Sequence, residues 1–180
     1  MFAEVLKLVS QIDRIRPGPA LHRDLPKLFR TLQTARKTDA LDAENRIWVR
    51  WEWHTSLQAA NALNVATGHL AAREYAEAET RLTALVHAYP DFAEAWNKRA
   101  TLFYLLKRDT ESIDDIARTL KLEPRHFGAL AGLGQILARH GRGDLAEITF
   151  AAALRLNPHL EGMAAALASL RSEARGGLLH

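Results

Sequence analysis

The sequence contains no cysteine among its 180 residues. Disulfide bonds, thiolate metal sites and a cysteine nucleophile are therefore excluded, although this absence does not decide the cellular compartment. No run approaches the ~18 uninterrupted apolar residues of a membrane-spanning helix, so no insertion into a membrane is expected. Glu4 and Lys7 interrupt the stretch that a signal peptide keeps apolar. We therefore expect a cytoplasmic protein, or a periplasmic one if a leader has been removed.

The sequence also lacks a large excess of either charge and has few of the residues typical of disordered chains. The formal net charge is only +3, and both signs are mixed along the chain. This gives little attraction for phosphates, so nucleic acid is not an expected partner. Ten glycines and six prolines, beside 48% apolar residues, favour one ordered domain with a continuous core.

The few prolines include three at a fixed interval, since Pro90, Pro124 and Pro158 are each 34 positions apart. This period is typical of a solenoid of helical hairpins. Small residues recur with the same period at two further positions, and large apolar residues at a third. The small residues are Ala66, Ala100 and Gly134, then Ala78, Ser112 and Ala146, and the large ones are Leu82, Ile116 and Phe150. We interpret these positions as contacts between the two helices of each hairpin.

This pattern resembles the tetratricopeptide repeat (TPR), which has an aromatic residue and a Leu-Gly pair in its first helix and Ala, Phe and Pro in its second. Trp96 stands at the aromatic position of the second unit, and Leu133 with Gly134 forms the pair in the third. The second unit departs from the pattern at Arg99. The resemblance, which extends to small bacterial TPR proteins, implies an all-α, right-handed superhelical solenoid of antiparallel helix pairs.

The repeat divides the chain into three predicted parts. They are an N-terminal helical capping region over 1–58, with a degenerate repeat at 25–58; three TPR units at 59–92, 93–126 and 127–160; and a C-terminal capping helix with a tail over 161–180. An amphipathic helix over 2–15 is expected before Pro17, Gly18 and Pro19, and it is the segment most prone to motion or to exchange onto a neighbouring molecule.

Acidic residues stand where several helices are expected to begin. Asp91 and Glu94 have the spacing of a capping box. Asp109 and Asp144 precede the second helices of two units, where an N-cap side chain would accept a backbone N–H bond.

Trp48, Trp51 and Trp53 form the densest aromatic cluster, and Arg46 and Arg50 are interleaved with them. Such a pattern can stack on the bases of a nucleic acid. Aromatic residues at helical spacing more often belong to a core. We therefore favour tryptophans that fill the space between the degenerate repeat and the first unit.

The sequence carries no recognisable catalytic, cofactor or metal site. Its eight histidines include no i, i+4 pair beside a carboxylate, as a helical metal site would require. Gly128, Gly132 and Gly134 do not follow a strand and so are not a dinucleotide fingerprint. Gly134 belongs to a helix contact. Gly128 and Gly132 indicate either the close approach of a partner or simply that the helix tolerates glycine at these positions. We expect no enzyme activity and no cofactor.

The TPR resemblance implies a function in protein interaction, because such arrays generally bind a peptide or a helix in the concave groove lined by the first helices. We expect a non-enzymatic adaptor or scaffold for a protein or peptide partner. The alternative is a homo-oligomeric structural module, such as a homodimer, that self-associates through its N-terminal helices. The groove positions implied in this sequence are Leu63, Asn64, Thr67, Leu70, Asn97, Lys98, Thr101, Tyr104, Leu105, Ala131, Gln135 and Arg139.

Some TPR domains hold the free carboxylate of a chaperone tail with a clamp of cations and amides. The corresponding positions in this sequence are Leu63, Thr67, Lys98, Gly128 and Gly132. Only Lys98 supplies a cation, and a desolvated carboxylate needs charge-assisted bonds. The departure from the clamp predicts poor binding of acidic C termini and favours an internal segment or a helix as ligand.

Overall fold

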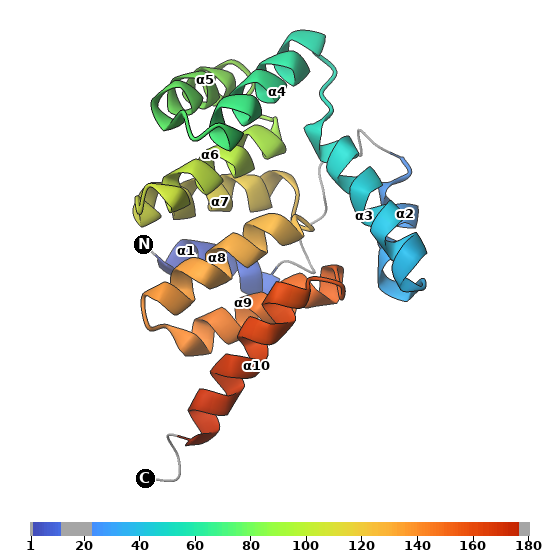
Figure 1. The fold of residues 1–180 in the computed structure, drawn as a ribbon, viewed down its shortest axis with the longest axis vertical. Helices are drawn as coiled ribbons and strands as arrows, with labels where there is room; N and C mark the ends of the chain where they lie inside the picture. Colours follow the sequence, from blue (N-terminus) through green and yellow to red (C-terminus); the bar gives the residue numbers. More distant parts are fainter. Residues whose placement is uncertain (1, 12–22, 177–180) are drawn as a thin grey trace.

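A computed structural model describes residues 2–11 and 23–176, and these residues form ten helices and no strand. The helices are α1 (Phe2–Gln11), α2 (Leu25–Thr34), α3 (Lys37–Glu52), α4 (Leu57–Ala71), α5 (Tyr75–Ala88), α6 (Ala93–Leu105), α7 (Asp109–Leu122), α8 (Phe127–Arg139), α9 (Gly143–Leu156) and α10 (Glu161–Gly176). The hairpins α4–α5, α6–α7 and α8–α9 stack in chain order (Figure 1), which confirms the expected all-α solenoid. Pro17, Gly18, Pro19 and residues 177–180 lie outside the described part.

The two helices of each hairpin touch where the repeat has small residues. A Cβ added at Gly134 would lie 2.4 Å from the ring of Phe150, so only glycine allows α8 and α9 this approach. In the preceding hairpin, the Ser112 hydroxyl donates a 2.8 Å hydrogen bond to the carbonyl of Ala100. These positions are buried, as the 34-residue pattern predicts.

The turn inside each hairpin also repeats every 34 residues. Arg73, Lys107 and Gly141 adopt positive φ angles of 61°, 62° and 68°, the left-handed conformation that glycine adopts most easily. After each of these turns, a backbone N–H group bonds to a carbonyl of the preceding helix. The donors are Glu74, Arg108 and Arg142, at 2.9, 2.8 and 2.9 Å. The turn therefore sets where the next helix begins.

The predicted N-caps at Asp109 and Asp144 are wrong for this reason. Arg108 and Arg142 occupy the N-cap positions of α7 and α9, and neither forms a side-chain cap. The two aspartates instead lie in the first turn of their helices, where the helix dipole favours a negative charge.

The hairpin α2–α3 lies beside the stack and does not continue it (Figure 1). Its helices contact α6 and α9, and the amide of Gln33 donates a 2.9 Å bond to the carbonyl of Arg155. The hairpin is apolar along one stripe, which packs with Phe127 at the start of α8. That stripe consists of Leu25, Leu28, Phe29 and Leu32. The packing of this stripe directs residues 25–52 to the side of the solenoid.

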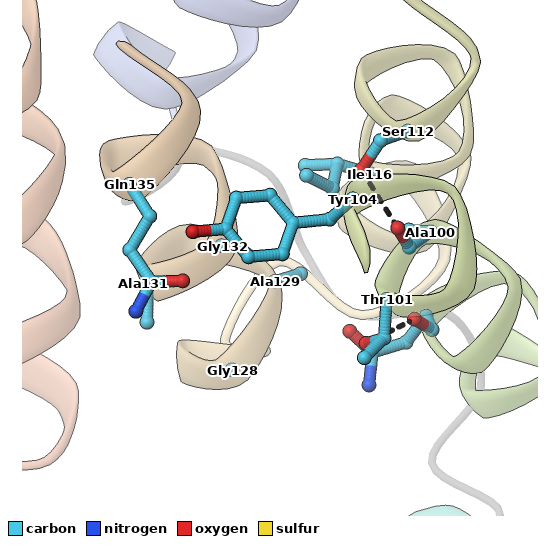
Figure 2. Close-up of a pocket in the computed structure, with 11 residues that line it drawn as sticks. Ala100, Thr101, Tyr104, Ser112, Ile116, Gly128, Ala129, Ala131, Gly132 and Gln135 are labelled. Atoms are coloured by element: carbon cyan, nitrogen blue, oxygen red, sulfur yellow. Dashed lines mark hydrogen bonds between the residues drawn. The ribbon is translucent and has the colours of Figure 1, made fainter. Parts of the chain in front are cut away.

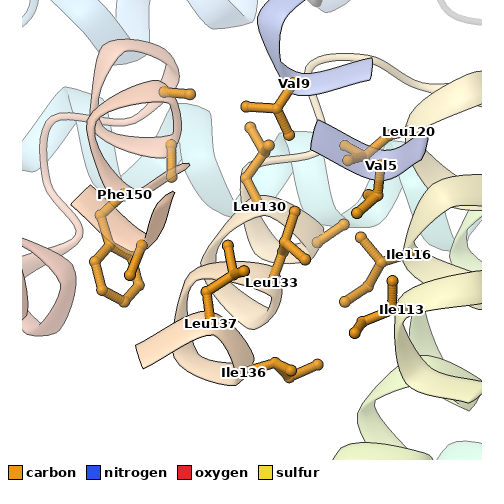
Figure 3. Packing of buried hydrophobic residues seen from close by; sticks show 14 of the residues in the cluster. Val5, Val9, Ile113, Ile116, Leu120, Leu130, Leu133, Ile136, Leu137 and Phe150 are labelled. Atoms are coloured by element: carbon orange, nitrogen blue, oxygen red, sulfur yellow. The ribbon is translucent and has the colours of Figure 1, made fainter. Parts of the chain in front are cut away.

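The first and last helices both pack on their own chain. Val5 and Val9 of α1 are 1% and 5% exposed and contact the cluster formed by α7, α8 and α9 (Figure 3). At the other end, α10 covers α9 with Leu167, which is also buried. The N-terminal helix is thus used within the chain, and the expected continuation of its apolar stripe at Ile12 and Ile15 lies outside the described residues.

Replacing Gly134 with alanine should lower the free energy of unfolding by about 1–3 kcal/mol, because the new Cβ would collide with Phe150. Gly132→Ala is the matched control in the same helix, since its Cβ would have its nearest neighbour at 3.8 Å. The control should be neutral or stabilising by up to about 1 kcal/mol, as expected for replacing a helical glycine. Urea denaturation measures both changes, and equal destabilisation would contradict the assigned helix contact.

Candidate functional site

Three adjoining hollows follow α4, α6 and α8, the first helices of the three hairpins, and we call them together the groove. The first hollow has a volume of about 230 Å³ and lies between α6, α7 and α8. Figure 2 shows Tyr104 reaching from α6 towards α8, where Gly132 leaves room. Further lining residues are Asn97, Ala100, Thr101, Ser112, Ile116, Gly128, Ala129, Ala131 and Gln135.

The other two hollows extend the groove from α6 to α4. One has a volume of about 300 Å³ between α3, α4, α6 and α8, and the other about 200 Å³ between α3 and α4. Asn97, Thr101 and Gly128 line both the first and the second hollow. Thr67 lines both the second and the third. The shared residues show that the three hollows form one continuous surface.

The structure places most of the predicted partner-contact residues along this groove. The ten that line it are Leu63, Asn64, Thr67, Leu70, Asn97, Lys98, Thr101, Tyr104, Ala131 and Gln135. Leu63 is only 2% exposed, so it belongs mainly to the core. Leu105 and Arg139 lie outside the three hollows, and the Arg139 guanidinium covers the Tyr104 ring at 4.3 Å. Contact of these residues with a partner stays a prediction.

Helix α3 forms a second wall of the groove, which the repeat pattern did not indicate. Trp48, Val49, Glu52 and Trp53 line the second and third hollows opposite α4 and α6. Val49 and Trp53 keep about half of their surface exposed, at 56% and 48%. A ligand in this part of the groove would therefore lie between the N-terminal hairpin and the solenoid.

Trp51 and Trp48 attach α3 to the start of the third unit. The prediction that these tryptophans fill the space beside the first unit is therefore wrong. The Trp51 ring, 6% exposed, stacks on His126 with a centroid distance of 4.0 Å. The Trp48 ring packs edge-on against Phe127 at 5.3 Å. A Cβ on Gly128 would lie 2.7 Å from Trp48, so this glycine allows the close approach of the chain's own tryptophan. Trp51 is thus part of the core, while Trp48 stays partly exposed at the second hollow.

A buried polar network lies beneath α3. The carboxylate of Glu94 is fully buried and contacts Nε2 of His126 at 2.7 Å and Nζ of Lys98 at 3.0 Å. Nδ1 of His126 accepts the N–H of Ala129 at 3.1 Å, so the ring proton lies on Nε2 and is donated to Glu94. Lys98 also lies 3.5 Å from Glu52 of α3. The network thus connects α6, α8 and α3.

The charges of this network stabilise one another. Burial by itself disfavours the Glu94 carboxylate, but the hydrogen bond from His126 and the charge of Lys98 bring the pKa of Glu94 below its ordinary value. Burial also opposes the Lys98 ammonium, yet Glu94 and Glu52 raise the pKa of Lys98. Glu94 is therefore an ionised internal partner, and the predicted capping box with Asp91 is wrong: α6 begins without a side-chain cap.

A departure from the repeat is the sequence signal for this network. Glu94 occupies the position held by Gly128 and Gly162 in the following segments, and His126 the position held by Phe92 and Leu160. Polar residues at positions that are otherwise apolar or glycine indicate a special local role. The 34-residue alignment could have identified these positions, but it could not have shown that the two side chains meet.

The groove contains side chains suited to binding a ligand through hydrogen bonds. The side chains of Asn61, Asn64 and Gln135 form no hydrogen bond within the described part of the chain, so their amides are available to a ligand. Residues 2–11 and 23–176 hold no cluster of histidine and acidic side chains that could bind a metal ion. Within the same ranges, none of the helices combines the length and apolarity needed to cross a bilayer.

Comparison with known proteins agrees with this architecture. A sequence model of the tetratricopeptide repeat matches residues 63–120 and 111–161, which together exceed half of the chain. A TPR repeat-containing protein of Rhizobium etli is 37% identical over 124 residues, which are 67% of this chain and 60% of that protein. DnaJ homolog subfamily C member 3 is 30% identical in Homo sapiens and 32% in Rattus norvegicus, over 49% of this chain and 18% of those proteins. The chain therefore spans less than two thirds of these relatives.

Glu94→Gln should lower the free energy of unfolding by about 1.5–3 kcal/mol near neutral pH, because Lys98 and His126 lose a charged partner. A carboxylate with a lowered pKa stabilises the fold above its ordinary value of 4.5, and this contribution is lost as the pH falls through the lower folded value. The difference between wild type and variant should therefore shrink below about pH 4.5 in urea denaturation.

The control for this prediction is Glu111→Gln, since Glu111 forms a half-exposed ion pair with Arg108 at 2.8 Å. Loss of such a pair changes stability by less than about 1 kcal/mol. A Glu94→Gln deficit that stays constant from neutral to acidic pH would contradict the ionised state of Glu94.

Proposed function

The chain belongs to the tetratricopeptide repeat family, and from this premise we propose that it is a non-enzymatic scaffold whose groove binds a peptide or helix of a partner protein. Repeats of this family generally mediate protein–protein interactions. Solenoids of stacked hairpins present long surfaces of this kind because each unit contributes the same helix face. The partner-contact residues of this proposal are those of the groove, with the α3 wall added.

The continuity of the groove is the observation that carries the proposal. Three hollows joined by Thr67, Asn97, Thr101 and Gly128 follow α4, α6 and α8 without an intervening barrier. A row of shallow hollows suits a chain segment that places successive side chains in them. A single deep cavity, as most small-molecule sites require, is a different geometry.

The chemistry of the lining supports the same conclusion. Free amides at Asn61, Asn64 and Gln135 can bond to the backbone of an extended peptide, each with a net contribution of about 0.5–1.5 kcal/mol. The rings of Tyr104 and Trp53 offer apolar surface for side-chain anchors, worth about 25 cal/mol for each Å² that a ligand buries. The groove therefore combines backbone recognition with apolar selectivity.

Thr101→Arg tests the groove directly, because this exposed residue lines two hollows and a long side chain there would fill their junction. Peptides selected from a display library on the wild-type chain should bind Thr101→Arg at least about tenfold more weakly in fluorescence titrations. Ile148→Arg is the control, since Ile148 is a 55% exposed apolar residue of α9 outside the groove.

Two results of this experiment would overturn the proposal. The first is a library that yields no ligand tighter than about 100 μM. The second is a set of ligands that bind the wild type and Thr101→Arg equally well, because they would use another surface. Circular dichroism of both variants checks that the helices remain intact.

Acidic peptides with a free C terminus should bind more weakly than about 100 μM. Lys98, the cation at the corresponding clamp positions, already neutralises Glu94 and Glu52 and is mostly buried. A terminal carboxylate would lose its hydration without a free charge to replace it. Titration of an acidic peptide and its C-terminally amidated form provides the check. Micromolar affinity that disappears on amidation would contradict this prediction.

A further inference from the structure

The outer face of the first hairpin is apolar and uncovered. Here α4 and α5 enclose a hollow of about 350 Å³, lined by Gln58, Asn61, Ala62, Val65, Arg81, Ala84, Leu85, Ala88 and Tyr89. Val65 is 47% exposed and the neighbouring Leu57 is 75% exposed. We call this surface the end face. It lies at the end of the solenoid where the stack begins (Figure 1).

The 34-residue period relates this surface to a covered surface of the third unit, whereas the second unit has Trp96, Arg99 and Arg118 at the same positions. Ala62, Val65 and Ala84 correspond to Leu130, Leu133 and Ala152 of the third unit. Those three residues are 0%, 0% and 2% exposed, within the cluster that α1 and α7 share with α8 and α9. The end face is thus the counterpart of a surface that α1 and α7 cover in the third unit. The hairpin that precedes the first unit lies at the side of the solenoid and does not cover the end face (Figure 1).

The end face carries both parts of a self-complementary contact. Leu57 projects at its edge, one helical turn before Asn61, and the small side chains of Ala62, Ala84 and Ala88 leave the hollow beside it. In a two-fold dimer each surface meets itself, so a projection and a hollow on the same face can fill one another. A second copy of the chain alone therefore supplies the matching shape.

The charge of the end face permits the same pairing. Arg81 is the charged residue of the lining, and its guanidinium forms a 2.7 Å ion pair with Glu77 one turn earlier in α5. The two charges cancel within one molecule, so two copies can approach without repulsion between like charges. Water would be released from the apolar surface on both sides.

From these observations we propose that the chain forms a two-fold homodimer through the end face of α4 and α5. This surface shares Asn61 with the third hollow of the groove and none of the other groove-lining residues, so the inference goes beyond the proposed function and leaves most of the groove of each copy open. The contact continues the stacking of the solenoid from one molecule into the next. Closure by a two-fold axis limits the assembly to two chains.

Sedimentation velocity of the full chain, from about 1 to 200 μM, tests the dimer. The wild type should reach twice the 20.1 kDa of one chain. Val65→Arg and Leu57→Glu should each remain monomeric, because a charge would be buried in the apolar contact. Ile148→Arg, an equally exposed substitution on α9, should remain dimeric.

Other outcomes overturn the proposal. If the wild type stays monomeric over the whole concentration range, the end face does not bind a second copy of the chain. Assemblies that grow beyond two chains would show a head-to-tail contact, and dimers that persist in both variants would show another interface. Loss of the dimer in Ile148→Arg as well would show that the effect is not specific to this face. None of these measurements depends on a groove ligand, so their failure is distinguishable from failure of the proposed function.

Discussion

The close contact between the paired helices is the constraint on which the structure depends. Gly134 lets the Phe150 ring reach the backbone of α8, and the Ser112 hydroxyl bonds to the carbonyl of Ala100 in the hairpin before. Since this contact recurs every 34 residues, each hairpin presents the same helix faces in the same orientation. One face of each hairpin lines the groove, and the two faces that meet the neighbouring hairpins are stacking surfaces.

Local and periodic features could be predicted from the sequence for this reason. Helix pairing and the small positions follow from one period, and the resemblance to the tetratricopeptide repeat implied that the first helices line the groove. The course of α2 and α3 could not be predicted, because it depends on contacts between residues far apart in the chain, such as Trp51 with His126. The sequence predicted a degenerate helical repeat over 25–58, but a repeat pattern does not specify which surface such a hairpin will cover.

The position of α3 changes the chemistry of the groove. Glu52 of α3 and Glu94 of α6 both face Lys98, so the ammonium is held by two carboxylates within the protein. Without α3, Lys98 would keep its ion pair with Glu94 and lose the one with Glu52. In this chain Lys98 binds α3, the second wall of the groove. The amides, hydroxyls and aromatic rings of the lining remain for contact with a ligand.

The same displacement exposes the end face. A hairpin stacked on α4 and α5 would have covered Val65, but it could not also have placed Trp48 against Gly128. The chain thus gains a second groove wall and loses a cover for its first unit, because one hairpin cannot occupy both places. An apolar stacking surface left in water favours association, and a second copy supplies the same surface in reverse orientation. The second groove wall and the proposed dimer contact therefore both depend on where α2 and α3 pack.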